Sequence, residues 1–346
     1  MHILVSSRNN YEMFDNFFLK KNKFPNEFII NVDAGSTNIN LEYGQQICKN
    51  KDITFLKTNE TGLQNVIQET IDYIFQKNNE SKWLLYLHTD AYLPDDNYKK
   101  LNKLLNNNYF DKFGLIGFNT VFWPHTKKFN EIDIKNKFYF GLMGKSILSE
   151  NNLSVYGPHT IFNTDIQSNW NNLVAIEAVM DIGVLVNISL FKKFIKVSKK
   201  FPFVCAFDDI AMQFLSNNIY NVTLPDIYCV HDPWVKKQYK IPISSPKNLK
   251  KTFNNKFYND DFSFEKEWKI KWKFDRQYKN KLKRPIVNNS IFKKIYTYIN
   301  NLNRLKKVQL SDEVKQIYKD TLIGDYMNYN RLYPYKIFED YKNIKN

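Results

Sequence analysis

The sequence predicts an α/β fold: a Rossmann-like, mostly parallel sheet flanked by helices. Short apolar runs rich in β-branched residues recur along the chain, as expected of buried strands. Amphipathic stretches with helical spacing separate several of these runs, and this alternation is typical of parallel sheets. At 346 residues with a hydrophobic fraction of 43%, the chain has room for a catalytic domain and an appendage.

Five apolar runs are the expected strands of the first part of the chain. They are "HILVSS" at 2–7, "EFIINVD" at 27–33, "ITFLKT" at 53–58, "KWLLYLHTD" at 82–90 and "FGLIGFNTV" at 113–121. After residue 120 the pattern loosens, and it tightens again at 178–194 and 207–234. We therefore expect one domain over 1–235, with a nucleotide-binding half over 1–120 and a second half over 121–235.

Two stretches between the strands have the spacing of amphipathic helices. In 62–77 the core-facing residues recur every three or four positions and are Val66, Ile67, Thr70, Ile71, Ile74 and Phe75. In 94–107, Asp95 and Asp96 suit the first turn, where the helix dipole favours negative charge.

Acidic residues follow two of the predicted strands. Asp33 ends one strand, and Asp90 lies just beyond the run Trp83 to Leu87. Ligands of open α/β sheets bind at the carboxyl ends of the strands. A carboxylate there is costly unless it is solvated, paired or bound to a cation. Each motif taken alone is equally consistent with a turn or a helix cap.

The order of these motifs resembles family 2 glycosyltransferases of GT-A fold. Those enzymes place a strand ending in D-x-G-S-x-D, a glycine-led helix, a strand ending in D-x-D, an E-D pair and a later His in this order. The corresponding stretches here are "VDAGSTN", "ETGLQNVIQETI", "LHTDAYLPDD", "FDDIAMQFL" and "CVHDP". The resemblance covers about residues 2 to 235.

The resemblance implies a nucleotide-diphosphate sugar as donor and a divalent cation, Mn²⁺ or Mg²⁺, as cofactor. The implied nucleotide-binding residues are Ser6, Arg8, Asp33, Gly35, Gly62 and Thr89, and the implied metal-binding residues are Asp90, His88 and His231. A cation held by hard ligands would neutralise the charge that develops on a diphosphate leaving group. Because His88 stands where the family has an acid, and Asn38 replaces another, metal dependence stays open.

The resemblance also implies an acceptor side with a catalytic base. Asp209 matches the expected base, with Asp208 in place of the family's glutamate. A carboxylate is required because an acceptor hydroxyl is a weak nucleophile until its proton is removed. Asp181 and Trp234 are the predicted acceptor-binding residues. The expected reaction is inverting transfer of a sugar to a glycan or lipid-linked acceptor, and both acids of the pair are also plausible helix caps.

The positive charge of the chain is concentrated in its later part. The net charge is +15, and residues 236–307 alone contain 21 Lys or Arg against 5 Asp or Glu. We expect 236–346 to be a helical, basic and aromatic-rich extension. Its composition suits a solvated helical face, an anionic membrane surface or, less well, single-stranded nucleic acid.

Targeting signals and cysteine spacing indicate where the protein is expected to act. The chain shows neither a signal peptide nor a long apolar span, and its three cysteines have no CxxC spacing, so we expect a cytoplasmic protein, peripheral on the membrane if the basic segment binds lipid. The sequence leaves open a homo-oligomer. The alternatives are a nucleotidyltransferase, although the first strand lacks a glycine-rich loop, and a nucleic-acid-binding protein acting through 236–307.

Overall fold

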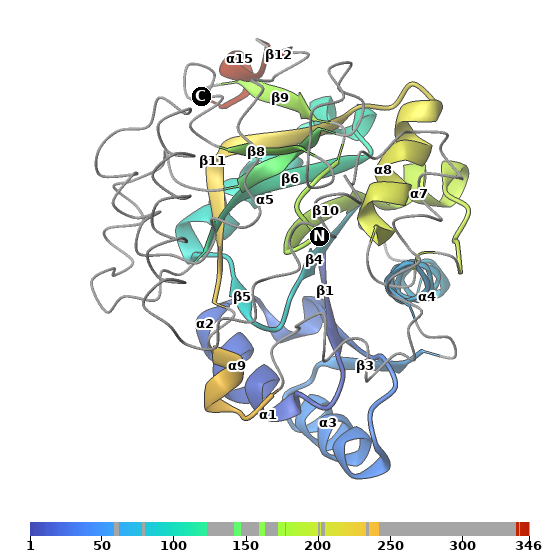
Figure 1. Cartoon of the computed structure of the whole chain (residues 1–346), viewed down its shortest axis with the longest axis vertical. Coiled ribbons are helices and arrows are strands. Elements are labelled where there is room, and N and C mark those ends of the chain that lie inside the picture. The colour runs from blue at the N-terminus through green and yellow to red at the C-terminus, as the bar shows by residue number, and fades with distance from the viewer. Residues whose placement is uncertain are drawn as a thin grey trace, which may run out of the picture.

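A computed structural model confirms the predicted α/β fold (Figure 1). It describes residues 1–58, 62–77, 80–122, 142–146, 159–162, 172–176, 178–199, 201, 205–232, 235–241, 337–338 and 340–345. Trp234 and residues 242–336 of the predicted helical extension lie outside these residues.

The described strands form one sheet. Its order is β12 (Ile337–Phe338), β9 (Leu173–Ile176), β11 (Asn221–His231), β6 (Leu115–Phe122), β10 (Gly183–Asn187), β4 (Trp83–Leu87), β1 (His2–Ser7), β2 (Ile29–Asp33) and β3 (Thr54–Lys57). Off this path, β5 (Ala91–Tyr92) pairs with β11, and β7 (Leu142–Ser146) pairs with β6 and with β8 (His159–Phe162).

Strand direction divides the sheet into two parts. β3, β2, β1 and β4 are mutually parallel, whereas β10 runs antiparallel to both of its neighbours, β4 and β6. β6 therefore points the same way as β4, and β11 is parallel to β6. As a result, the carboxyl ends of β1, β2, β4, β6 and β11 lie at the same edge of the sheet, together with the amino end of β10.

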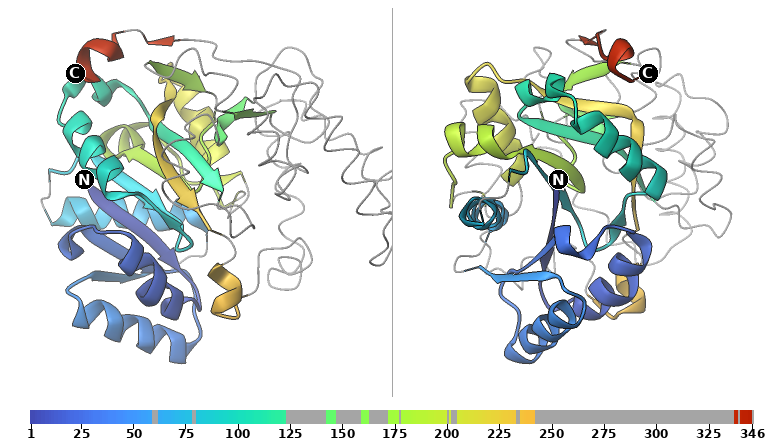
Figure 2. Two further views of the ribbon diagram at one scale, coloured as in Figure 1. Left: turned by 90° about the vertical axis from the view of Figure 1, so that its left-hand side faces the viewer. Right: turned by 180° about the vertical axis from the view of Figure 1, so that it is seen from behind.

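Helices cover both faces of the sheet, because successive strand residues point to opposite sides. Ile3 and Val5 belong to one apolar cluster, whereas Leu4 belongs to the other. The elements with residues packed in the first cluster are α1 (Tyr11–Met13), η1 (Phe14–Phe18), α2 (Leu19–Lys21), α3 (Asn38–Asn50), α5 (Asp95–Leu105) and η3 (Asn108–Lys112). The second receives α4 (Leu63–Gln76), α7 (Ile188–Phe194) and α8 (Ala206–Ser216), and the views in Figures 1 and 2 show these three helices together on one side.

The helix predicted at 62–77 is confirmed as α4. Val66, Ile67, Ile71 and Ile74 are buried against the sheet as expected. Phe75, expected on the same face, is instead 41% exposed, and the ammonium of Lys192 lies 3.9 Å from its ring centroid. The predicted helix at 94–107 is α5, and both Asp95 and Asp96 lie in its first turn.

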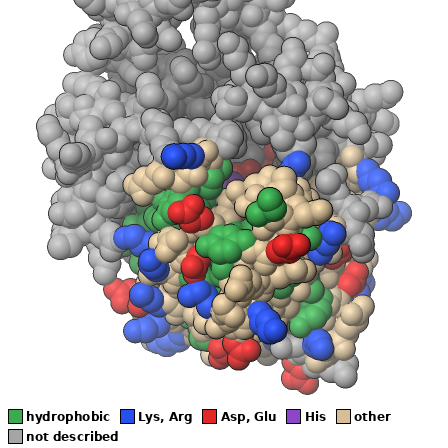
Figure 3. All heavy atoms as spheres, turned by 90° about the horizontal axis from the view of Figure 1, so that it is seen from below, with side chains coloured by type: hydrophobic (Ala, Val, Ile, Leu, Met, Phe, Trp, Pro, Cys, Tyr) green, Lys and Arg blue, Asp and Glu red, His purple; other side chains and the backbone are tan. Residues whose placement is uncertain are grey.

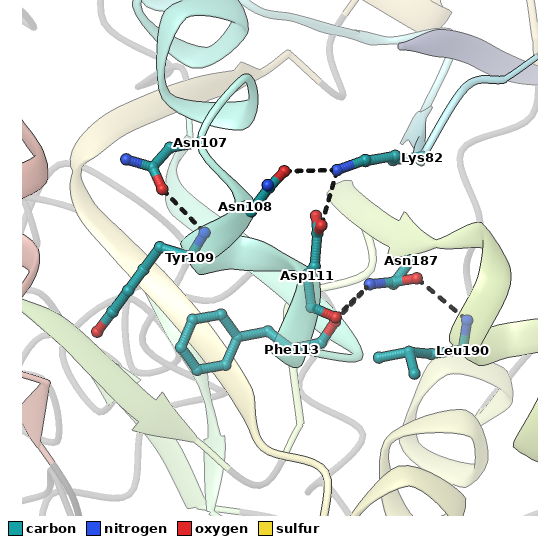
Figure 4. Close-up of polar contacts among 8 residues, drawn as sticks. All are labelled: Lys82, Asn107, Asn108, Tyr109, Asp111, Phe113, Asn187 and Leu190. Carbon is teal, nitrogen blue, oxygen red and sulfur yellow. Dashed lines mark hydrogen bonds and ion pairs between the residues drawn. The ribbon is translucent and has the colours of Figure 1, made fainter.

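The end of the sheet opposite these carboxyl ends is closed by polar contacts (Figure 4). Nζ of Lys82, just before β4, lies 2.7 Å from Oδ1 of Asn108 and 2.7 Å from Oδ2 of Asp111. Nδ2 of Asn187 donates to the carbonyl of Asp111 at 3.1 Å, and its Oδ1 accepts from the amide of Leu190 at the start of α7. These contacts bind the 3-10 turn η3 to β4 and β10.

The last described residues return to the sheet. β12 pairs with β9, and Tyr341 of α15 (Tyr341–Lys345) is fully buried in the first cluster. The ring of Phe338 lies edge-on to those of Phe113 and Tyr220, with centroids 5.1 and 5.5 Å away. The sheet thus includes a strand from beyond residue 236, while the domain boundary at 235 stays a prediction. In the described part of the chain, no helix is both long and apolar enough to span a bilayer.

Candidate metal and donor site

The strand order creates a switch point beside β1. The chain passes from β1 to β2 and β3 on one side, then returns to place β4 on the other side of β1. Loops leaving the carboxyl ends of β1 and β4 therefore separate in opposite directions, and ligands of open α/β sheets bind at such a point. His88 and Asp90 follow β4 at this edge.

Backbone pairing brings His231 to Asp90, although 141 positions separate them. β5, which follows Asp90 directly, pairs with the end of β11 so that Ala91 faces His231. The amide of Asp232 also donates to the carbonyl of Asp90 at 2.8 Å. On the other side, the amide of His88 donates to the carbonyl of Ile182 at 3.1 Å, which joins β4 to the turn before β10.

His88, Asp90 and His231 form a compact cluster with the arrangement of metal ligands. One ligand atom from each lies within 4.8 Å of the others. Nε2 of His231 is 3.1 Å from Oδ2 of Asp90, and Nδ1 of His88 is 3.7 Å from Oδ1. Asp90 is 1% exposed, whereas the side chains of His88 and His231 are 29% and 12% exposed. The imidazoles therefore lie between solvent and a buried carboxylate.

The electrostatics of the cluster keep Asp90 ionised and His88 neutral. Burial opposes the charge of Asp90, but His231, Lys236 and His88 outweigh it and hold the pKa of the carboxyl far below its ordinary value. Desolvation lowers the pKa of His88, although the charges of Asp90 and Asp181 oppose that shift. A neutral imidazole and an ionised carboxylate are the forms that bind a metal ion.

One buried oxygen of the cluster supports a cation site. Among the described residues, none forms a hydrogen bond with Oδ1 of Asp90. An unsatisfied buried carboxylate oxygen is costly, and a cation held by the cluster would supply its partner. Two imidazoles and one carboxylate suit Mn²⁺ better than Mg²⁺, which prefers ligands that are all oxygen. The residues therefore fit the cofactor that the sequence predicted.

Asp33, predicted to bind the nucleotide base, shapes the loop after β2. Its Oδ2 accepts a 2.6 Å hydrogen bond from the hydroxyl of Tyr11, and its Oδ1 accepts from the amides of Gly35 and Ser36, both at 3.0 Å. Gly35 has φ 93°, a conformation that favours glycine. Burial opposes ionisation, but the hydrogen bonds from Ser36, Tyr11 and Gly35 hold the pKa of Asp33 below its ordinary value. The described contacts of this carboxylate are therefore within the protein.

The other predicted nucleotide-binding residues lie on neighbouring loops. Ser6 and Arg8 are half-buried at the end of β1. The side chain of Asn10 accepts from the amide of Arg8 at 2.9 Å and donates to Oγ1 of Thr89 at 2.8 Å, which ties the ends of β1 and β4 together. Gly62, with φ 131°, immediately precedes α4 as its N-cap residue.

Asp208 and Asp209 lie in the first turn of α8 and are both 2% exposed. Oδ2 of Asp209 accepts hydrogen bonds from Nε2 of Gln64 and Nε2 of Gln213, each at 2.9 Å. Gln64 also donates to the carbonyl of Ala206 at 3.0 Å and accepts from the amide of Ser198 at 2.7 Å. The predicted base thus takes part in a polar network that joins α4 to α8, and its role in catalysis stays a prediction.

Asp181, predicted to bind the acceptor, lies beside the metal cluster. It is half-buried in the turn before β10, next to the residue whose carbonyl bonds His88. Burial raises the pKa of Tyr86, and the charges of Asp181 and Asp90 raise it further. The charge of Asp181 therefore reaches both Tyr86 and His88, as expected of a carboxylate close to the cluster.

Three residues that contact the predicted site carboxylates were not predicted as site residues. Lys236 was counted with the basic segment, yet its ammonium lies 2.7 Å from Oδ2 of Asp90. Tyr11 and Gln64, which bond two of the predicted site carboxylates, were not singled out. Their only signal in the sequence is a polar group on an otherwise apolar helical face, which many structural residues share.

Comparison with solved structures returns glycosyltransferases. The chain resembles GalNAc-T7, crystallised with UDP, GalNAc and Mn²⁺, at 10% identity and a TM-score of 0.42, over 67% of this chain and 42% of that one. It resembles S. aureus TarS 1–349 at 12% identity and a TM-score of 0.40, over 100% and 90% of the two chains. For a longer TarS structure the identity is 12% and the TM-score 0.43, over 94% and 54%.

Both proteins are glycosyltransferases of GT-A fold. The chain spans less than half of GalNAc-T7 and about half of the longer TarS structure. No protein-family model matches the chain, and no curated protein is similar to it in sequence. With identities of 10–12%, the function has to be inferred from this chain's own residues.

Proposed function

We propose that the protein is a GT-A glycosyltransferase that moves a sugar from a nucleoside diphosphate donor to a hydroxyl of a glycan or lipid-linked acceptor. The observation that carries this proposal is the cluster of His88, Asp90 and His231 at the switch point of the sheet. A neighbouring loop, shaped by Asp33, has the small residues and backbone amides that suit nucleotide binding.

The three clustered residues would hold a divalent cation, for which we propose Mn²⁺. When bound, the cation would neutralise the negative charge that develops on the diphosphate as the glycosidic bond breaks. The residues of the chain have two tasks in this scheme. His88 and His231 keep the cation at the edge of the sheet, and the buried Asp90 supplies the negative charge that attracts it.

Inverting transfer requires a base for the acceptor hydroxyl. In one step the base takes the hydroxyl proton, the oxygen attacks the anomeric carbon, and the bond to the diphosphate breaks with its electron pair leaving on the diphosphate. The sequence predicted Asp209 as this base. Two observations support Asp181 instead: it adjoins Ile182, whose carbonyl accepts from the amide of His88, and Oδ2 of Asp209 already accepts two amide hydrogen bonds. We therefore propose Asp181 as the base.

A panel of nucleotide sugars tests the proposed function. Thermal melting of the full chain is measured with each nucleotide sugar, with and without Mn²⁺, and stabilising donors are then assayed for release of the nucleoside diphosphate. We expect Mn²⁺-dependent stabilisation by at least one donor and its loss in Asp90→Asn. If no nucleotide sugar stabilises or reacts, a role in sugar transfer is rejected.

We further propose that the basic segment 236–307 brings the enzyme to an anionic membrane surface, where a lipid-linked acceptor for polysaccharide synthesis would lie. The charge distribution supports this, because the excess of cations falls in this segment. By contrast, the face of the described part seen from below carries acidic and basic side chains interspersed (Figure 3). Sedimentation with phosphatidylglycerol vesicles, but not phosphatidylcholine vesicles, is the expected result at low salt. Equal sedimentation with both would reject an electrostatic membrane contact.

A further inference from the structure

Lys236 lies against the carboxylate of the candidate metal site. It belongs to the short helix α9 (Val235–Gln238), five residues beyond His231. Its Nζ is 2.7 Å from Oδ2 of Asp90, the oxygen that also lies 3.1 Å from Nε2 of His231. The lysine side chain is only 19% exposed, so this contact lies inside the site rather than on an open surface.

The backbone holds Lys236 in this position. The amide of Asp232 donates to the carbonyl of Asp90 at 2.8 Å, and the amide of Val235 donates to the carbonyl of Asp232 at 3.3 Å. Val235 is 2% exposed, and the amide of Ile241 donates to the carbonyl of Lys236 at 2.9 Å. Backbone hydrogen bonds therefore hold the segment that carries Lys236 next to Asp90.

An ammonium and a divalent cation that share one buried carboxylate repel each other. Asp90 provides one negative charge, which Lys236 already balances. A divalent cation on the same cluster would add two positive charges within a few ångströms of the ammonium, where little water screens the repulsion. Lysine carries its charge on a flexible four-carbon stem, so the ammonium of Lys236 can leave the carboxylate without a change in the backbone of α9.

We infer that Lys236 competes with a divalent cation for Asp90, and so sets the metal affinity of the site. This inference rests on the metal site of the proposed function. In the metal-free protein the lysine neutralises a buried carboxylate that would otherwise be costly. Binding of the cation displaces the ammonium from Oδ2, so the side chain of Lys236 has two positions that depend on metal occupancy.

Mn²⁺ binding by the full chain, without nucleotide, tests this inference. Free Mn²⁺ is measured by electron paramagnetic resonance during titration of wild type, Lys236→Met, Lys236→Arg and Lys103→Met. Lys236→Met keeps an unbranched apolar stem and removes the charge, so we expect Mn²⁺ to bind at least about tenfold more tightly. Lys236→Arg should bind as weakly as wild type. Lys103, exposed on α5, is the matched control and should leave the affinity unchanged.

Two results would overturn the inference. The first is unchanged or weaker Mn²⁺ binding by Lys236→Met, which would show that the lysine does not compete. The second is no Mn²⁺ binding by wild type or by any variant. Metal-free melting checks that Lys236→Met is folded; if it is not, Lys236→Gln, which keeps a hydrogen-bond donor without charge, replaces it. Nucleotide-sugar turnover by wild type separates the two proposals, because it can persist when the affinity does not change.

Discussion

Nε2 of Gln64 on α4 lies 2.9 Å from Oδ2 of Asp209 on α8, a residue 145 positions later in the chain. The same carboxylate oxygen accepts from Gln213 on the next turn of α8. A buried carboxylate with these partners stabilises the packing of α4 on α8. Asp209 is therefore expected to matter for folding, whether or not it has a catalytic role.

Replacing Gln64 by Leu should destabilise the protein by about 1–3 kcal/mol, because buried donors and acceptors on Asp209, Ala206 and Ser198 lose their partner. Urea unfolding followed by circular dichroism measures the change. Gln68→Leu is the matched control, since Gln68 lies on the same helix and bonds only Asp72 among the contacts described for it. Equal free energies of unfolding for the two variants would contradict a structural role for the network.

Asp181→Asn should lower kcat for sugar transfer by about 10²–10⁴-fold, because an amide cannot take the acceptor proton. The affinity for the donor, measured by titration with Mn²⁺, should stay within about twofold. Asp209→Asn should instead lower the free energy of unfolding and reduce activity only in proportion to the folded fraction. The opposite pattern, with kcat lost in a stable Asp209→Asn protein, would restore Asp209 as the base.

Asp33→Asn should destabilise the protein at pH 7 by about 1–3 kcal/mol, since a charged acceptor of three hydrogen bonds becomes neutral. The pKa of Asp33 in the folded state lies below its unfolded value of 3.8, so the stabilisation is complete above that value. It is lost as the pH falls from there through the folded pKa. The difference between the wild-type and variant free energies of unfolding should therefore stay constant at higher pH and shrink as the pH falls below 3.8. A constant difference would contradict this assignment.

Gly44→Ala should disturb the loop after β2 by displacing Tyr11, which bonds Asp33. A Cβ at Gly44 would lie 2.3 Å from the ring of Tyr11, whose hydroxyl bonds Asp33. Because that ring is fully packed, we expect a loss of roughly 1–3 kcal/mol from overpacking. Gly35→Ala is an informative comparison, because its cost would come from the positive φ, with no atom within 4 Å of the added Cβ. Gly44→Ala that melts at the wild-type temperature would contradict this packing.

Tyr341→Ala should destabilise the protein by about 3–5 kcal/mol if the end of the chain is part of the same folding unit. Tyr341→Phe, which removes only the hydroxyl, is the control and should cost much less. A single unfolding transition shifted as a whole is the expected observation. A separate low-temperature transition would show instead that β12 and α15 unfold independently.

The sequence pattern predicted much of the sheet because buried strands and α4 have strong apolar periodicity. The helix α3 was not predicted, since only Gly44, Ile47 and Cys48 of its residues are buried and Ile39 is 82% exposed. Local periodicity cannot identify a helix with so narrow an apolar face. β5, of two residues, was likewise too short to show a pattern.

His88, Asp90 and His231, predicted as metal ligands from the family resemblance, lie together in the structure, whereas the protein partners of each carboxylate were not predicted. The contact of His231 with Asp90 depends on the pairing of β5 with β11, which no local pattern encodes. Lys236 was assigned to the basic segment because charge was counted along the sequence, not in space. The hydrogen bonds of Asp33 to Tyr11 and of Asp209 to Gln64 are likewise long-range contacts.

The pairing of Ala91 with His231 has a consequence for biosynthesis. When only the first 120 residues have emerged from the ribosome, β1, β2, β3 and β4 are complete, but His231 has not been made. The nascent chain would then hold a carboxylate whose histidine and lysine partners have yet to be translated. Capture of a cation would thus come late, once translation has passed β11 and that strand has docked.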